Sequence, residues 1–211
     1  MCIRDRKLPL TQHLLVRISA LLGSTDNDLI LAAMLWMGHD GLLRLDEIAR
    51  PLKVKHIIWG PLNRRFNLQL DRTKTHRQGG PVSVAFKIRQ GPCAVRALRQ
   101  LFDSRNLWNK PEAILFPSRH RSKSGCVSGS WFRRHIKRLC SAIGLDGARY
   151  SGHSLRAGGA TALFVARVPY AVIKRAGRWR SDACLLYYRD SAHVQRKIFG
   201  AFDRLATRST R

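Results

Sequence analysis

The chain has 211 residues, a length that suits one sizeable domain, and 45% of them are hydrophobic, enough for a packed core and too many for wholesale disorder. It carries 39 Lys and Arg against 13 Asp and Glu, and the net charge of +26 indicates a polyanionic partner, with nucleic acid the first candidate. The five cysteines form no C-x-x-C pair, which argues against a disulfide framework or a zinc ribbon and favours a reducing, intracellular compartment.

The N-terminal part of the chain predicts three helices. Residues 1–6 (MCIRDR) join no pattern, and we treat them as a ragged or non-native start before a domain that spans residues 7–211. Residues 11–22 place leucines and an isoleucine on one helix face behind a threonine cap. The apolar run at residues 29–37 is far shorter than a membrane span and predicts a buried helix, and residues 41–50 predict another.

The centre of the chain changes to strands and the rest returns to helices. Residues 54–59 predict a strand, and residues 66–88 predict a hairpin, because two alternating apolar runs flank a turn rich in Lys, His and Gly. Helical patterns follow at residues 94–102, at 130–144, around His153 and Arg156, and at 169–177, 181–189 and 192–206. Strands do not alternate with helices, so we expect an α+β fold that is mostly α, with a helical core and a small antiparallel sheet or hairpin.

Positive charge is concentrated in the second half of the chain. Residues 1–60 carry eight basic and six acidic side chains, whereas residues 113–181 carry fourteen basic and one acidic. We therefore expect this half to face nucleic-acid phosphates. The side chains predicted to contact DNA are Arg119, Arg121, Lys123, Arg133, Arg134, Lys137, Arg178 and Arg180.

His153 and Arg156 are candidates for chemistry on a phosphodiester. Their spacing of three residues puts both on one face of a helix. Arg binds phosphate oxygens through a planar, permanently charged fork, and a neutral His accepts a proton. Asp46 and Glu47 are the only adjacent acids, so the sequence supports two-metal nuclease chemistry poorly. A hydrolase nucleophile elbow also fails, because G-x-S-x-G requires glycine where Arg156 stands.

Four motifs in order resemble one family. GLLRLDEIAR, DRTKT, SGHSLRAGG and AGRWRSDACLLYYRD follow the order and approximate spacing of the tyrosine recombinases, or phage-type integrases, and resemble the Cre-like enzymes most. The resemblance covers about Pro9 to Ala206. It implies the fold of a recombinase catalytic domain and an enzyme that breaks and rejoins DNA in recombination or integration of a mobile element.

The resemblance implies a role for each motif residue. Arg44 and Arg156 would bind the nonbridging oxygens of the scissile phosphate, and Lys74 would protonate the 5′ leaving oxygen. His153 would take the proton of the nucleophile. Trp179 would hydrogen-bond the phosphate through its ring N–H, and Glu47 would help to hold the site together.

Tyr188 would be the nucleophile. Its neighbour Tyr187 is the competitor, because adjacent helix residues point about 100° apart and only one can face the site. The step of nine residues from Trp179 favours Tyr188. Tyrosine has a pKa of about 10, so it needs an adjacent base and a positive cradle. The implied cycle forms a 3′-phosphotyrosine, frees a 5′-hydroxyl, and uses no metal, ATP or other cofactor.

Several further expectations and alternatives stay open from the sequence. A type IB topoisomerase shares this chemistry, and a non-catalytic DNA-binding remnant of a mobile element would share the charge. The resemblance implies double-stranded DNA as partner, a monomer in isolation, a tetrameric synapse on DNA and no membrane. It also implies an intracellular, DNA-associated location, in the cytoplasm and nucleoid or in the nucleus. The family usually carries an N-terminal DNA-clamping domain, which we expect to be absent from these residues. We therefore expect that the natural protein is longer, or that this chain binds DNA weakly and recombines poorly without that domain. The last helix, residues 192–206, would dock on a neighbouring protomer or on its own domain.

Overall fold

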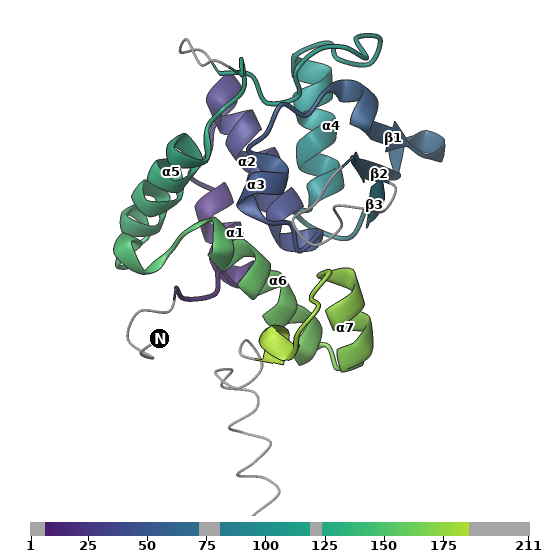
Figure 1. Cartoon of the computed structure of the whole chain (residues 1–211). Coiled ribbons are helices and arrows are strands. Elements are labelled where there is room, and N and C mark those ends of the chain that lie inside the picture. The colour runs from purple at the N-terminus through teal and green to yellow at the C-terminus, as the bar shows by residue number, and fades with distance from the viewer. Residues whose placement is uncertain (1–6, 72–80, 119–123, 186–211) are drawn as a thin grey trace, which may run out of the picture.

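The computed structural model describes residues 7–71, 81–118 and 124–185. The predicted residues Lys74, Arg119, Arg121, Lys123, Tyr187 and Tyr188, the start at residues 1–6 and the helix at 192–206 lie outside the described residues. The helices and strands, shown in Figure 1, are α1 (Gln12–Ser19), α2 (Asp26–Asp40), α3 (Leu45–Ile48), β1 (Ile57–Trp59), β2 (Arg65–Leu70), β3 (Val82–Lys87), α4 (Ala94–Ser104), α5 (Gly129–Ala142), α6 (Gly152–Val165) and α7 (Tyr170–Ala176), and short 3₁₀ turns lie between them, of which η5 (Asp182–Cys184) follows α7.

Helix α2 is the centre of the core. The Thr25 hydroxyl accepts a hydrogen bond from the Asp28 backbone N–H, which satisfies a free donor at the start of the helix. The helix is then buried almost continuously from Leu29 to His39, and it contacts both α4 and α6. A helix that is apolar on all sides must be covered on all sides. Figure 1 accordingly shows α2 between α4 and α6.

The predicted hairpin is confirmed as part of a three-stranded antiparallel sheet in the order β1-β2-β3. Leu68 pairs with Ile57 on one side and with Val84 on the other. Along β2, Phe66, Leu68 and Leu70 are buried and the residues between them are more exposed, which is the alternation of a half-buried strand.

Some predicted elements are shorter in the structure than the sequence predicts. Residues 54–56 form a 3₁₀ turn, so the first strand begins only at Ile57. The helix expected over residues 41–50 is confined to Leu45–Ile48. Leu42 has φ 49° and so lies in the left-handed region, which ends α2 before α3 can begin.

The small residues of α6 allow the close approach of other backbone segments. A Cβ on Gly158 would lie 1.8 Å from the Leu10 carbonyl oxygen, and one on Gly159 would lie 2.1 Å from the His39 carbonyl oxygen. The Leu10 N–H also donates to the Ser154 carbonyl at 2.8 Å. The glycines therefore serve packing within the domain, and they bring α6 against the end of α2.

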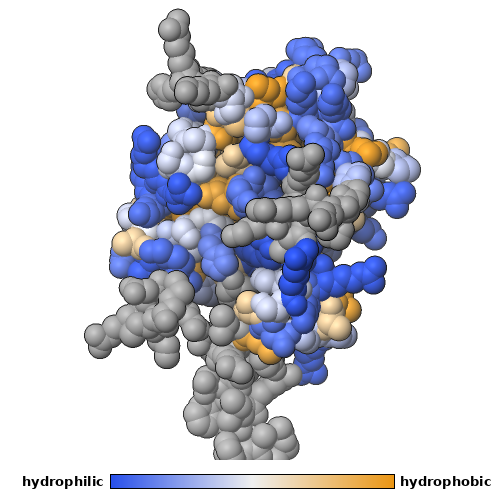
Figure 2. All heavy atoms as spheres, viewed as in Figure 1, coloured by the Kyte–Doolittle hydropathy of each residue, from blue (hydrophilic) through white to orange (hydrophobic). Residues whose placement is uncertain are grey.

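On the face shown in Figure 2, hydrophilic residues surround small hydrophobic areas among the described residues. Within the described ranges, no helix has both the length and the apolar character that a membrane span needs.

We expect Gly159→Ala to lower the free energy of unfolding by about 2 to 3 kcal/mol, because the new methyl group would overlap the His39 carbonyl and force α6 away from α2. Denaturant unfolding measures the loss. Gly23→Ala is the matched control, because its Cβ would meet only the Asp28 carboxylate oxygen, at 3.4 Å. Equal stability of the two variants would contradict this account of the packing.

Candidate active site

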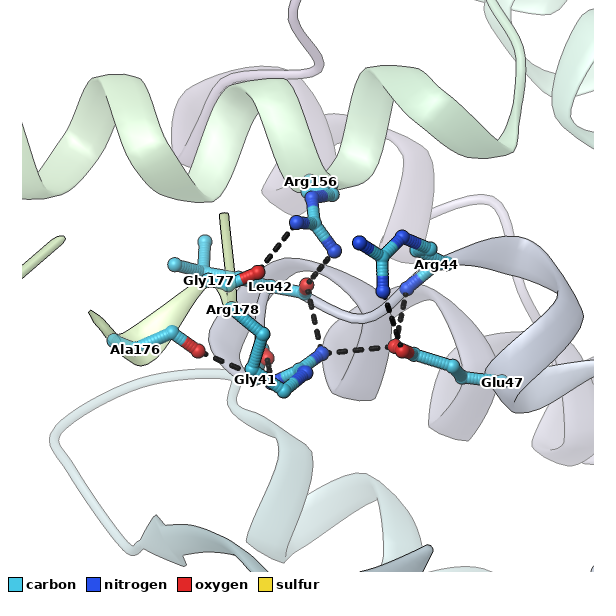
Figure 3. A network of polar contacts seen from close by, with 8 residues as sticks. All are labelled: Gly41, Leu42, Arg44, Glu47, Arg156, Ala176, Gly177 and Arg178. Atoms are coloured by element: carbon cyan, nitrogen blue, oxygen red, sulfur yellow. Dashed lines mark hydrogen bonds and ion pairs between the residues drawn. The ribbon is translucent and has the colours of Figure 1, made fainter. Parts of the chain in front are cut away.

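Arg156 is buried where α6 meets the ends of α2 and α7. Only 2% of the residue is exposed. One guanidinium nitrogen donates to the Leu42 carbonyl at 3.1 Å and the other donates to the Gly177 carbonyl (Figure 3). The guanidinium carbon also lies 4.2 Å from the centre of the Trp179 ring. Two carbonyls and an aromatic face therefore fix the plane of this buried cation.

Glu47 is the buried carboxylate of the site. It is 1% exposed. Its Oε2 accepts the Arg44 backbone N–H at 2.8 Å, and its Oε1 accepts from Arg44 Nη1 at 3.0 Å. The first contact caps the start of α3 from position N3. The second holds the Arg44 guanidinium, whose side chain stays 20% exposed, beside a carboxylate that burial requires to be paired.

Arg178, which the sequence predicts as a DNA contact, is mostly buried in the structure. Its guanidinium points inward, its side chain is 12% exposed, and its Nη2 lies 2.8 Å from Glu47 Oε2. The same nitrogen donates to the Leu42 carbonyl at 3.2 Å, and Nη1 donates to the Ala176 carbonyl at 3.0 Å. Glu47 therefore has an arginine on each side, Arg44 and Arg178 (Figure 3).

Both helix ends at the site close with the same hydrogen-bond pattern. After α2, the Leu42 and Leu43 N–H groups donate to the carbonyls of residues 39 and 38, and after α7 the Arg178 and Trp179 N–H groups donate to those of residues 175 and 174. This is the Schellman motif, whose left-handed position is usually glycine. Here that position holds Leu42 and Arg178, with φ of 49° and 58°.

The glycines next to these two left-handed residues are required because aromatic rings pack against their Cα atoms. Gly41 and Gly177 each stand one residue before the left-handed residue, at the C-cap of α2 and of α7, and both have a negative φ. A Cβ on Gly41 would lie 2.5 Å from the Phe86 ring, and one on Gly177 would lie 1.6 Å from the Trp179 ring.

His153 stands one turn before Arg156 near the start of α6, with its outer side exposed. Desolvation by the protein atoms around the ring lowers its pKa from 6.5, and the positive charges of Arg156 and Arg44 lower it further. The imidazole is therefore mainly neutral near pH 7, the form that accepts a proton.

The segment that leads toward residue 188 is tied to α7. Lys174 Nζ donates to Asp182 Oδ1 at 2.7 Å, and the Tyr170 hydroxyl donates to the same oxygen. These two hydrogen bonds, Lys174 first, lower the pKa of the Asp182 carboxyl. Asp182 lies in the turn η5, so the chain leaves the described region from a point attached to α7.

An open cavity of about 400 Å³ lies between β3 and the end of α7, beside Arg178. Val82, the first residue of β3, lines it together with Leu42 and Arg175. Residues 72–80, which include Lys74, join β2 to this end of β3. In the part of the chain that the structure describes, no group of three or more His, Cys, Asp or Glu side chains is arranged to hold a metal ion.

The structure thus brings Arg44, Glu47, His153, Arg156 and Trp179 together. Arg133, Arg134 and Lys137 are exposed side chains on α5, and Arg180 is exposed just after Trp179. The sequence reading missed the carbonyls of Leu42 and Gly177, which fix Arg156. No residue pattern could have shown them, because a backbone carbonyl is present at every position.

We expect His153 to titrate below pH 6.5, and Arg44→Gln to raise its pKa because one of the two nearby positive charges is removed. NMR titration of the histidine ring signals, assigned with His153→Gln, measures both. As the pH falls, the unfolded chain takes up the proton first, so this group lowers stability below pH 6.5 and not above it. Arg167→Gln should leave the pKa unchanged, and a His153 pKa at or above 6.5 would refute the assignment.

The sequence and the fold both match known proteins. The model of the "Phage integrase family" matches residues 10–194. The crystal structure of XerH site-specific recombinase bound to palindromic difH substrate, in a post-cleavage complex, aligns with a TM-score of 0.70 at 15% identity, over 95% of this chain and 54% of that one. The crystal structure of XerA recombinase aligns with a TM-score of 0.68 at 16% sequence identity, over 96% of this chain and 65% of that one.

The Tn1549 transposon integrase in complex with circular intermediate DNA aligns with a TM-score of 0.56 at 17% identity, over 92% of this chain and 65% of that one. The chain therefore spans just over half to two-thirds of the length of these structures. At such identities the likeness concerns the fold. No curated protein matches the sequence.

Proposed function

The chain belongs to the phage integrase family and has the fold of a tyrosine recombinase catalytic domain, and on that premise we propose that it cleaves and rejoins DNA strands in site-specific recombination through a 3′-phosphotyrosine intermediate. The observation that carries the proposal is the convergence of Arg44 with His153 and Arg156, from parts of the chain more than one hundred residues apart. Arg44 is held by buried Glu47, and Arg156 is held by the Leu42 carbonyl two residues before Arg44.

In this proposal the two arginines bind the scissile phosphate. The negative charge on its nonbridging oxygens grows in the pentacoordinate transition state, and preorganised positive donors stabilise it there more than in the ground state. Arg44 offers the more exposed guanidinium, and Arg156 offers one whose plane is already fixed. Trp179, whose ring lies against the Arg156 guanidinium, would donate its ring N–H to the phosphate.

The covalent step conserves atoms and charge without an external reactant. The Tyr188 oxygen attacks phosphorus as its proton passes to neutral His153, and the bond from phosphorus to the 5′-oxygen breaks as Lys74 protonates that oxygen. The reverse step uses a 5′-hydroxyl from a partner strand. The phosphodiester is exchanged for a phosphotyrosine ester, so the energy of the bond is retained and no ATP is needed.

The surrounding features support these roles. The cavity beside Arg178, lined by the first residue of β3, leaves open space next to the arginine cluster. The net charge of +26 supports DNA as the substrate. The Cre-like detail, a separate DNA-clamping domain that works with residues 7–211, the tetrameric synapse and the location on nucleoid or nuclear DNA stay predictions.

Covalent trapping tests the proposal. The chain is mixed with nicked suicide duplexes tiled across the DNA that flanks its coding sequence. We expect an adduct that survives denaturant and EDTA, that is lost in Tyr188→Phe and kept in Tyr187→Phe. Arg156→Lys should lower the rate of adduct formation by about 10²-fold or more, because a lysine cannot reproduce the oriented fork.

Other results would redirect the assignment. Loss of the adduct only in Tyr187→Phe would move the nucleophile by one residue. Salt-sensitive DNA binding without an adduct on any duplex would favour a non-catalytic DNA-binding module. Relaxation of supercoiled plasmid without strand exchange between duplexes would favour topoisomerase activity.

A further inference from the structure

Arg178 occupies a backbone position that suits glycine. It is the left-handed residue of the turn that ends α7, with φ 58°. Any residue with a Cβ is disfavoured there. The preceding Gly177 cannot take the role, because α7 ends with that glycine at φ −79° under the Trp179 ring. The Arg178 side chain makes contacts that a glycine could not make.

Those contacts join three elements of the site. Arg178 donates to the carbonyls at the end of α2, with Leu42 O at 3.2 Å and Gly41 O at 3.5 Å, and to Ala176 O at the end of α7. It also pairs with Glu47 of α3 at 2.8 Å. Its Nε is buried as well. The guanidinium is therefore an internal clamp (Figure 3).

The clamp acts on both candidate phosphate-binding arginines. Glu47 holds Arg44 through both carboxylate oxygens, and Arg178 fixes the same carboxylate from the other side. The Leu42 carbonyl accepts from Arg178 and from Arg156. Loss of Arg178 would free the carboxylate to turn and would remove one of the two donors that fix this carbonyl.

We propose that Arg178 is a positioning residue, which orients Arg44 through Glu47 and Arg156 through the Leu42 carbonyl without itself touching DNA. The inference rests on the proposed function for its effect on cleavage. The clamp itself is a statement about the folded chain, and it can be tested without cleavage.

The salt dependence of DNA binding separates a positioning role from a phosphate contact. The binding constant K for a random-sequence 30-bp duplex is measured from 50 to 300 mM salt. Each phosphate that the protein neutralises adds about one unit to the slope of log K against log salt. Arg178→Gln should keep the slope of the unaltered chain, whereas Arg134→Gln, on the exposed face of α5, should lose about one unit. A loss of one unit in Arg178→Gln would overturn the proposal.

The cleavage rate at saturating DNA tests the positioning itself. Arg178→Gly relieves the backbone and removes the clamp, and it should lower the rate about 10- to 100-fold, as loss of partners that orient an active-site side chain commonly does. The dissociation constant should stay within about twofold, because no phosphate contact is lost.

Arg167 provides the matched control. It holds the same left-handed position at the end of α6, with φ 61° and an exposed side chain. Arg167→Gly should melt no lower than the unaltered chain and keep its cleavage rate. Equal rates in Arg178→Gly and Arg167→Gly would refute a positioning role.

A double variant shows whether Arg178 acts through Glu47. Glu47→Gln and Arg178→Gln should each lower the cleavage rate by some factor. The double variant should not show the product of these two factors, because both substitutions remove the same ion pair. Multiplying losses would contradict the route through Glu47. The double variant should also melt no lower than the less stable single variant, and a melting temperature lowered by the sum of the two single shifts would contradict the clamp.

The two proposals fail in different ways. If the unaltered chain forms no adduct on any duplex, the proposed function fails. The role of Arg178 is then still tested by the salt dependence of DNA binding and by the melting temperatures of the Glu47 and Arg178 variants. An adduct with unaltered kinetics in every Arg178 variant would leave the function standing and remove the positioning role.

Discussion

The site depends on one buried carboxylate. Glu47 is almost fully removed from water, and an unpaired charge there would be strongly unfavourable, so the fold must supply cations to it. It does so from its own helix, through Arg44, and from the end of α7, through Arg178. Removing one partner of such a buried pair generally costs about 3 to 5 kcal/mol. The Glu47 carboxylate therefore holds together the start of α3 and the end of α7, whose arginines would otherwise repel one another.

The second constraint is the approach of α6 to α2. Arg156 reaches the Leu42 carbonyl only because Gly159, one turn later on α6, allows its helix to touch the end of α2. A guanidinium is rigid and its hydrogen bonds are directional, so a small retreat of α6 would separate donor from acceptor. Core packing and site geometry are thus set by the same contact.

Features that depend on local sequence could be predicted, whereas features that depend on distant contacts could not. Residue types and spacing predict α1 behind Thr11, the hairpin of β2 and β3, and the juxtaposition of His153 with Arg156, because each follows from local periodicity or capping. The helix over residues 41–50 is predicted too long, since periodicity does not reveal the left-handed Leu42. Arg178 is predicted to face DNA, because a positive side chain near a phosphate site looks alike whether it points outward or inward. Its direction depends on Glu47, and only tertiary structure places the two together.

The bond between Glu47 and Arg178 spans 131 residues of sequence. A ribosome releases Arg44 and Glu47 long before it has added Arg178, and domains of this size fold as units once their last core elements emerge. A growing chain therefore carries Arg44 and Glu47 before Arg156 and the second cation, Arg178, have been added. For a protein whose proposed reaction passes through a broken DNA strand, this separation makes cleavage competence a property of the finished domain.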